Sequence, residues 1–409
     1  VIGAYYADPE RSTSTVDGGE AYVFLGKKSG YKSTFDLADV DGSNGFRFNG
    51  AAEDDLAGWS VGPAGDVDGD GWDDILIAAP GGQDEYLYRG ANNHSISVDL
   101  ANFSAYTGTS IQSGTAHLPD GRWVDTAGDM NGDGKDDILV GGPWNDADND
   151  GTGRSYDSGM SWVIFGGTKS TLGAVFDVSD LDGSNGFLIN GIDVADLSGN
   201  SISTAGDING DGYADIILGA KQGDASGSNS GESYVIFGKS SGFSAELDLA
   251  KLNGSNGFRI AGVDSHDQAG FSVNDAGDMN GDGYDDFVIG APYADPDNHS
   301  SAGETYVVFG KSSGYTTTLK LESLDDTEGF RIEGIDANDQ AGFSVNTAGD
   351  VNGDGYADII IGAPGAASSK GESYVVFGGD FTGDSTITAA SGDDQLTVSS
   401  TSIGSTTEL

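Results

Sequence analysis

The chain has 409 residues, of which 68 are glycine and none is cysteine, and its formal net charge is −48. The lack of cysteine excludes disulfides, thiolate metal sites and cysteine nucleophiles, and the acidity makes nucleic acid and anionic membrane surfaces poor partners. No apolar run reaches the length of about 18 residues that a membrane-spanning helix needs, so no such helix is predicted.

Three sequence markers recur along the chain and divide it into similar units. An acidic, glycine-rich string begins at Gly65, Gly128, Gly206, Gly277 and Gly349. An aromatic segment that ends in glycine recurs six times, for example as YVFLG from Tyr22 and YVVFG from Tyr306. A third segment, such as GFRIEG from Gly329, is divergent in the second unit, where only SIQSG near Ile111 stands in its place. The predicted units are 1–56, 57–115, 116–196, 197–268, 269–340 and 341–409.

One complete unit, residues 269–334, indicates how the chain folds. AGFSV is a short strand, DFVIGAP is a continuous apolar strand, ETYVVFG is the aromatic strand, and GFRIEG alternates apolar and polar residues. Four short strands per unit, with no helical period, predict an all-β fold, namely a β-propeller of four-stranded blades with an acidic loop between the first two strands of a blade. A β-solenoid is the alternative, but its repeats are usually shorter.

The two ends of the sequence bear on how the ring closes. VIGAYYADP from Val1 matches VIGAPYADP from Val288, so the chain starts within a blade and Val1 is not expected to be a natural start. Residues 385–400 align with residues 330–345, which predicts a last outer strand near Ile387 and an inner strand near Val398. This inner strand is expected to complete the N-terminal blade of a six-bladed ring, and a seven-bladed ring is the alternative.

The acidic string reads D-x-[D/N]-G-D-G-x-x-D, and its residues are numbered here as positions 1 to 9. Positions 1, 3, 5 and 9 can supply side-chain oxygens and position 7 a backbone carbonyl, while the glycine at position 6 permits a sharp turn. Such an oxygen shell suits Ca²⁺, whereas Mg²⁺ keeps more water and Zn²⁺ prefers His or Cys. About five Ca²⁺ sites are predicted, with the ligands Asp66, Asp68, Asp70, Trp72, Asp74, Asp129, Asn131, Asp133, Lys135, Asp137, Asp207, Asn209, Asp211, Tyr213, Asp215, Asp278, Asn280, Asp282, Tyr284, Asp286, Asp350, Asn352, Asp354, Tyr356 and Asp358.

A solvated acidic turn and a catalytic carboxylate pair are the alternatives for this string. A catalytic pair needs only two acids in different environments, and five equivalent copies argue against a single active centre. Position 3 is Asp68 in the first loop and asparagine in the other four, so charge alone predicts that the first loop binds calcium most tightly. Asp73, at position 8, is expected to point away from the metal, because Ala214 and Ala357 occupy that position in two other loops.

The units resemble the FG-GAP repeats of the integrin α-chain β-propeller, which also occur in bacterial surface proteins. The acidic loops carry the resemblance, together with GFSV from Gly270 and Gly342 and GAP from Gly290 and Gly362. GAP is altered to AAP at Ala78 and to GAK at Gly219, and integrin propellers have seven blades. The resemblance implies an extracellular or cell-surface module for adhesion or assembly.

A partner is expected on one rim of the propeller, where the variable loops that begin at Tyr6, Trp144 and Tyr293 gather. The partner is a protein or a glycan, so a lectin-like function is the alternative, and the propeller of a larger secreted enzyme is a less favoured one. No catalytic residue is predicted, because the histidines stand in no recognisable constellation, at His94, His117, His266 and His299.

Overall fold

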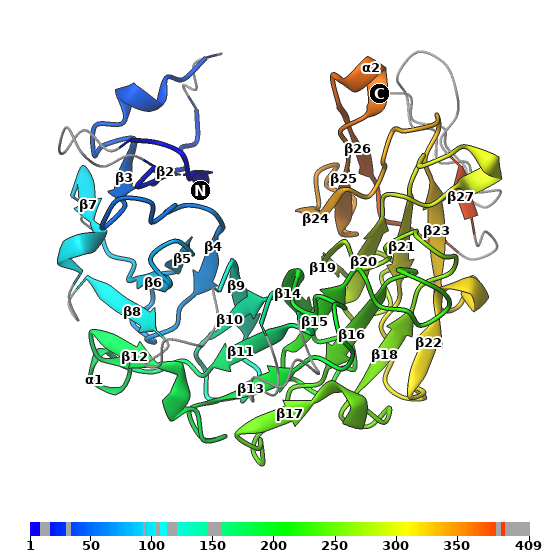
Figure 1. Cartoon of the computed structure of the whole chain (residues 1–409), viewed down its shortest axis with the longest axis horizontal. Helices are drawn as coiled ribbons and strands as arrows, with labels where there is room; N and C mark the ends of the chain where they lie inside the picture. Colours follow the sequence, from blue (N-terminus) through cyan, green and yellow to red (C-terminus); the bar gives the residue numbers. More distant parts are fainter. Residues whose placement is uncertain are drawn as a thin grey trace.

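The structure is a computed structural model, and it describes residues 1–8, 17–29, 34–92, 95–103, 107–112, 121–145, 157–381 and 386–388. Within these residues the chain is built from six β-sheets that follow one another along an open arc, with the first and the last sheet at its two ends (Figure 1). The sheets are named blades 1 to 6 in chain order, and they confirm the predicted all-β architecture of propeller blades.

The strands of each blade follow the order of the sequence units. Blade 1 contains β1 (Ile2–Ala4), β2 (Glu20–Phe24), β3 (Gly45–Asn49) and β7 (Ser97–Asp99). Blade 2 contains β4 (Val61–Gly65), β5 (Asp74–Ala79), β6 (Asp84–Tyr88), β8 (Gly108–Gln112) and β12 (Val175–Asp177). Blade 3 contains β9 (Trp123–Gly128), β10 (Asp137–Gly142), β11 (Met160–Ile164), β13 (Gly186–Asn190) and β17 (Glu246–Asp248).

Blade 4 contains β14 (Ser201–Gly206), β15 (Asp215–Ala220), β16 (Glu232–Ile236), β18 (Gly257–Ala261) and β22 (Thr318–Lys320). Blade 5 contains β19 (Ser272–Gly277), β20 (Asp286–Ala291), β21 (Glu304–Val308), β23 (Gly329–Glu333) and β27 (Thr386–Thr388). Blade 6 contains β24 (Ser344–Gly349), β25 (Asp358–Ala363) and β26 (Glu372–Val376).

The described helices are all single turns. Two are α-helical, α1 (Lys169–Leu172) and α2 (Ala366–Ser369), and the 3-10 turns are Leu37–Asp39, Leu100–Asn102, Val178–Asp180, Leu249–Lys251, Pro296–Asn298 and Leu321–Ser323. In the part of the chain that the structure describes, no helix has the length and apolar character needed to cross a bilayer.

Blades 1 to 5 gain an outermost strand that the four-strand pattern does not predict. This strand belongs to a later unit of the sequence and pairs in parallel with the fourth strand of the blade, as β22 does with β18 through Leu319 and Ile260. The strand expected near Ile387 exists as β27, but Ile387 pairs with Ile332 of β23 in blade 5. The alignment that gave it a place in the last blade was therefore wrong, and the strand expected near Val398 lies outside the described residues.

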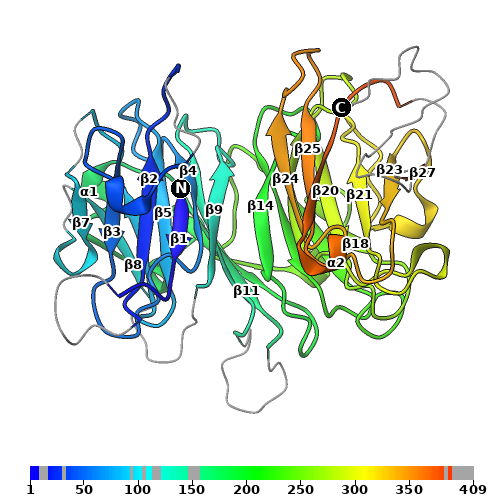
Figure 2. The ribbon, with the colours of Figure 1, turned by 90° about the horizontal axis from the view of Figure 1, so that it is seen from above.

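The innermost strands β4, β9, β14, β19 and β24 contact one another in sequence and line the concave side of the arc. Figure 2 shows β4, β9 and β14 running alongside each other. The core lies between blades: Val288, Val307 and Phe330 of blade 5 form one buried cluster with Ile359, Ile361 and Val376 of blade 6.

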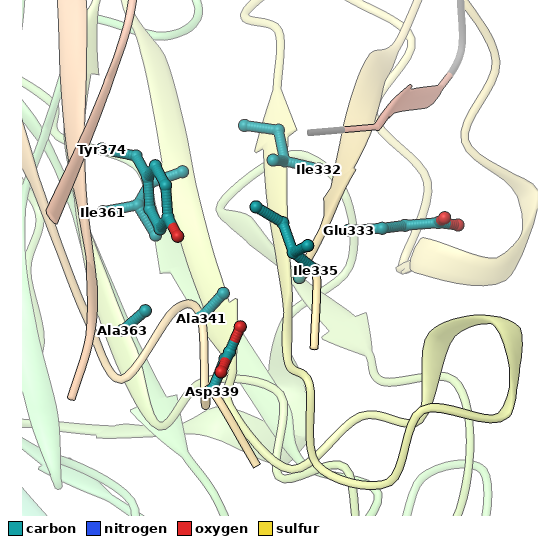
Figure 3. A pocket seen from close by; sticks show the side chains of 9 residues that line it. Ile332, Glu333, Ile335, Asp339, Ala341, Ile361, Ala363 and Tyr374 are labelled. Atoms are coloured by element: carbon teal, nitrogen blue, oxygen red, sulfur yellow. The ribbon is translucent and has the colours of Figure 1, made fainter. Parts of the chain in front are cut away.

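The seam between blades 5 and 6 is closely packed. Ile332 and Ile335 face Ile361 and Tyr374 across it, while Glu333 points away (Figure 3). The cavity between them has a volume of about 10 Å³, which is close to the space of a single water molecule. Apolar burial of this kind stabilises the contact between neighbouring blades.

Candidate metal sites

Each acidic loop joins the innermost strand of a blade to its second strand. The five loops are named loop 1 (66–74), loop 2 (129–137), loop 3 (207–215), loop 4 (278–286) and loop 5 (350–358). A β-bulge precedes each loop, as where Gly277 rather than Ala276 pairs with Asp286. Gly277 has φ of +63°, a conformation that side-chain-bearing residues disfavour, so glycine permits the strand to turn into the loop.

Loop 4 illustrates how side-chain oxygens converge. The backbone N–H of Asp282 donates to Asp278 Oδ1 at 3.0 Å and to Asn280 Oδ1 at 2.8 Å, so oxygens from positions 1 and 3 lie close together. The N–H of Tyr284 donates to Asp282 Oδ1 at 3.0 Å, which fixes the side chain at position 5. Loops 2, 3 and 5 make the same bonds. This donor set of hard oxygens fits Ca²⁺.

Loop 1 brings three carboxylates together without the bond at position 3. One oxygen each of Asp66, Asp68 and Asp70 lies within 4.8 Å of the others. The N–H of Asp70 donates to Asp66 at 2.9 Å, while both oxygens of Asp68 are buried without a hydrogen bond. Burial raises the pKa of Asp68, and Lys169 and Arg89 oppose that shift.

Position 9 is buried in every loop and holds two backbone N–H groups. In loop 4, Asp286 Oδ2 accepts from Met279 N at 2.9 Å and Asp286 Oδ1 accepts from Gly310 N at 2.9 Å. The other four loops make the equivalent pair of bonds. The position 9 carboxylate therefore ties the loop to the end of the third strand, and it can bind a cation only in addition to these bonds.

Burial also makes the position 9 carboxylates harder to ionise. Loss of contact with water raises the pKa of Asp74 to about 7 and the pKa values of Asp137, Asp215 and Asp286 to about 8. Negative charges at positions 1 and 5 raise them further in loops 2, 3 and 4. A bound cation would favour the ionised form of these groups.

These pKa values predict how the metal-free protein responds to pH. Between about pH 4 and pH 8 the folded state holds protons on these aspartates that the unfolded chain, with ordinary values near ~3.9, has released. The melting temperature of metal-free protein should therefore fall as pH rises through that range. Thermal melts of dialysed protein at a series of pH values would measure this trend. A metal-free melting temperature that rises from pH 5 to pH 8 would contradict it.

Neighbouring loops are joined to one another through position 8. The N–H at this position donates to the carbonyl at position 1 of the preceding loop, as Ala214 does to Asp129 at 3.1 Å. In blades 3 and 5 the side chain joins too: Asp136 Oδ2 accepts from Asp66 N at 2.8 Å, and Asp285 Oδ2 accepts from Asp207 N at 2.8 Å. Loops 1 to 5 thus form a continuous row of hydrogen-bonded turns.

Position 7 packs along the same row. A Cβ atom on Gly210, at position 4 of loop 3, would lie 2.4 Å from the ring of Tyr284 at position 7 of loop 4. Glycine at position 4 therefore makes room for the next loop, a constraint that the loop sequence alone did not reveal. Asp73 is exposed, as expected, but the structural role of its counterparts Asp136 and Asp285 was missed.

Comparison with known proteins identifies the repeats. The FG-GAP repeat family matches residues 57–98, 121–163, 198–236, 272–308 and 341–376. Each match spans one acidic loop and the strands on both sides of it. The five matches therefore coincide with the core strands of blades 2 to 6.

Several longer proteins are similar to the chain. Integrin alpha pat-2 of Caenorhabditis elegans is 30% identical over 251 residues, which cover 58% of this chain and 18% of the relative. Phosphatidylinositol-glycan-specific phospholipase D of Dictyostelium discoideum is 31% identical over 47% of this chain and 20% of its own length. Integrin alpha-IIb of Mus musculus is 29% identical over 44% of this chain and 16% of its own length. The chain thus spans at most about a fifth of these relatives.

Proposed function

Because the chain is an FG-GAP repeat protein with an integrin-like β-propeller, we propose that it is a calcium-stabilised, non-enzymatic module for adhesion or assembly at the cell surface or outside the cell. The integrin relatives support an interaction with a protein partner. The convergent oxygens of the loops support calcium binding, with about five sites at the residues predicted from the sequence.

Calcium would act on the scaffold rather than on a substrate. The side chains at positions 1, 3 and 5 would hold the ion, and the clamp at position 9 would keep the loop on its blade. Calcium neutralises carboxylates that otherwise repel one another, and extracellular modules bind it with Kd of roughly 10⁻⁴ to 10⁻³ M. The phospholipase D relative shows that such repeats also occur beside enzymes, and we propose no catalytic residue within this chain.

The partner surface that we propose lies at the opposite end of the inner strands from the calcium loops. Trp59, Arg122 and Phe271 occupy equivalent positions just before β4, β9 and β19. The guanidinium of Arg122 lies 5.3 Å from the ring centre of Trp59 and 4.6 Å from that of Trp144. Tyr5 joins the same cluster, with its ring 4.8 Å from Trp59.

Exposure of these rings is the observation that carries the proposal. Tyr6 is 64% exposed and Trp144 is 43% exposed, and both residues begin variable loops on the rim. A second cluster surrounds Phe271, whose ring lies 4.7 Å from that of Phe343 and 6.0 Å from that of Tyr293. Tyr, Trp and Arg are the residues most enriched at the energetic centres of protein interfaces, so this end of the propeller suits a protein partner.

A lectin-like function is the second candidate, because aromatic rings recur at the starts of the rim loops at Tyr6, Trp144 and Tyr293. Flat sugar faces stack on exposed aromatic rings. The Trp59 and Trp144 rings already contact Arg122, which leaves less open ring surface for a sugar. This contact favours the protein partner over the glycan.

The variant Trp144→Ala/Arg122→Ala tests the proposed surface. Beads coated with the protein should bind extracellular matrix proteins or cells in the presence of calcium, and the variant should lose about tenfold or more in binding, because buried Trp and Arg dominate such interfaces. Val175→Ala, an exposed apolar residue on the outer strand β12, is the matched control. Binding that survives in the double variant would contradict the proposed surface, and binding only to a glycan array would support the lectin.

A further inference from the structure

Loop 1 differs from its counterparts at three positions that meet in space. Its position 3 is Asp68, where the other loops have asparagine. The residue that follows the third strand is Arg89 in blade 2 and phenylalanine in blades 3 to 6, at Phe165, Phe237, Phe309 and Phe377. The second residue of the fourth strand is Thr109 in blade 2 and phenylalanine in blades 3 to 5, at Phe187, Phe258 and Phe330.

These three residues form a buried, connected unit. Arg89 Nε lies 3.1 Å from Asp68 Oδ2, and the two side chains are 1% and 2% exposed. Arg89 also donates from its guanidinium to Thr109 Oγ1 at 2.8 Å, and Thr109 Oγ1 donates to the carbonyl of Gly173 at 2.9 Å. Arg89 is therefore held in place from the side opposite the loop.

A second cation reaches loop 1 from α1. Lys169 Nζ lies 3.8 Å from Asp68 Oδ2 and 3.8 Å from Asp70 Oδ2. Two positive side chains thus contact the carboxylates at positions 3 and 5, the oxygens that a metal ion would need. Arg89 also lies close enough to Asp74 to interact with its charge.

The counterparts of this unit are apolar in the other blades. Phe165 and Phe187 lie with their ring centres 6.0 Å apart, and Phe237 and Phe258 lie 5.9 Å apart. No charge therefore enters loops 2 and 3 from these positions, and the asparagine of each loop is free to accept the N–H of position 5. Exchange of a phenylalanine pair for Arg89 and Thr109 accompanies the exchange of asparagine for Asp68.

We propose that Arg89 takes the place of calcium in loop 1, so that this loop binds calcium more weakly than loops 2 to 5. The proposal rests on the proposed function, namely that the other loops bind calcium. A calcium ion in loop 1 would have to separate Asp68 from Arg89, and breaking a buried ion pair leaves an uncompensated buried charge. The extra carboxylate, which by charge alone predicts the tightest site, instead neutralises the arginine.

Loop 2 shows why burial of the cation matters. Lys135 Nζ lies 3.1 Å from Asp133 Oδ2, but the lysine side chain is 23% exposed and the aspartate 40%. Solvent-exposed ion pairs of this kind are weak and readily exchanged for other partners. Calcium can therefore displace Lys135, whereas Arg89 has no path to solvent.

Terbium luminescence can test loop 1 separately from the other loops. Tb³⁺ replaces Ca²⁺ at oxygen sites and is sensitised by a neighbouring tryptophan, and position 7 is tryptophan only in loop 1, at Trp72. The emission excited through tryptophan should appear at a Tb³⁺ concentration about tenfold or more above the filling of the other loops. It should vanish in Trp72→Phe, and calorimetry with calcium should show four stronger sites in the wild-type protein.

The variant Asp68→Asn/Arg89→Phe/Thr109→Phe gives loop 1 the residues of its counterparts. Its tryptophan-excited emission should move into the range of the other loops, and calorimetry should show five similar sites. Asn209→Asp in loop 3 is the matched control, because it adds the fourth carboxylate without an arginine and should tighten that loop. Emission from Trp72 that saturates together with the other loops in the wild-type protein would overturn the inference alone, and that titration decides the matter even if the triple variant fails to fold. Absence of calcium binding by all loops would overturn the proposed function itself.

Discussion

Removal of calcium is expected to lower the melting temperature of the protein by roughly 10 to 20 °C. At about millimolar calcium, a site with Kd of ~10⁻⁴ M contributes about 1.4 kcal/mol to folding. Four such sites, in loops 2 to 5, therefore contribute about 6 kcal/mol, which is comparable to the stability of a whole domain. Differential scanning calorimetry with and without excess EDTA measures the effect.

The controls for this experiment separate calcium from ionic strength. Magnesium at the same concentration should restore little of the loss, because Mg²⁺ demands a smaller octahedral shell and dehydrates reluctantly. Raised sodium chloride screens the repulsion among exposed carboxylates but supplies no ligand exchange, so it should restore only part. A melting temperature that EDTA leaves unchanged would refute the calcium-stabilised propeller.

Replacement of a position 9 aspartate should destabilise the protein even without metal. In Asp286→Ala the N–H groups of Met279 and Gly310 lose their buried acceptor. An unsatisfied buried donor costs about 1 to 3 kcal/mol, so the expected loss is about 2 to 6 kcal/mol in the free energy of unfolding. Chemical denaturation of metal-free protein measures this loss.

Asp282→Ala is the matched control in the same loop. Asp282 is exposed at position 5 and accepts only the N–H of Tyr284 among the backbone groups near it. This variant should unfold within about 0.5 kcal/mol of wild type when metal is absent, and it should lose calcium binding at loop 4. Equal losses for both variants in metal-free protein would show that position 9 acts only as a metal ligand.

The row of loops suggests how these losses spread. Ala357 N donates to Asp278 O and Asp285 N donates to Asp207 O, so loops 3, 4 and 5 are hydrogen-bonded in series. A loop that loses its metal or its clamp therefore disturbs the neighbour on each side. Interactions between blades of this kind make repeat proteins cooperative.

Local patterns in the sequence determined the repeat, the strands and the loops. The apolar run after Asp286, the aromatic segment that ends in Gly310 and the loop spacing all lie within single units, so periodicity and turn chemistry reveal them without a structure. The same reasoning predicted the propeller, because several four-stranded units must bury their faces against one another.

Contacts between units were decided only by the tertiary structure. The parallel pairing of β27 with β23 and the bridge from Asp136 to the backbone of Asp66 join residues far apart in the chain. Arg89 belongs to an aromatic strand by sequence, and only folding places it against Asp68. Local sequence reports which turn can form, whereas the charge at that turn depends on side chains that arrive from other strands and blades. The sequence therefore determined where cation-binding loops occur, and the tertiary structure decided that one of them is already in contact with a buried arginine.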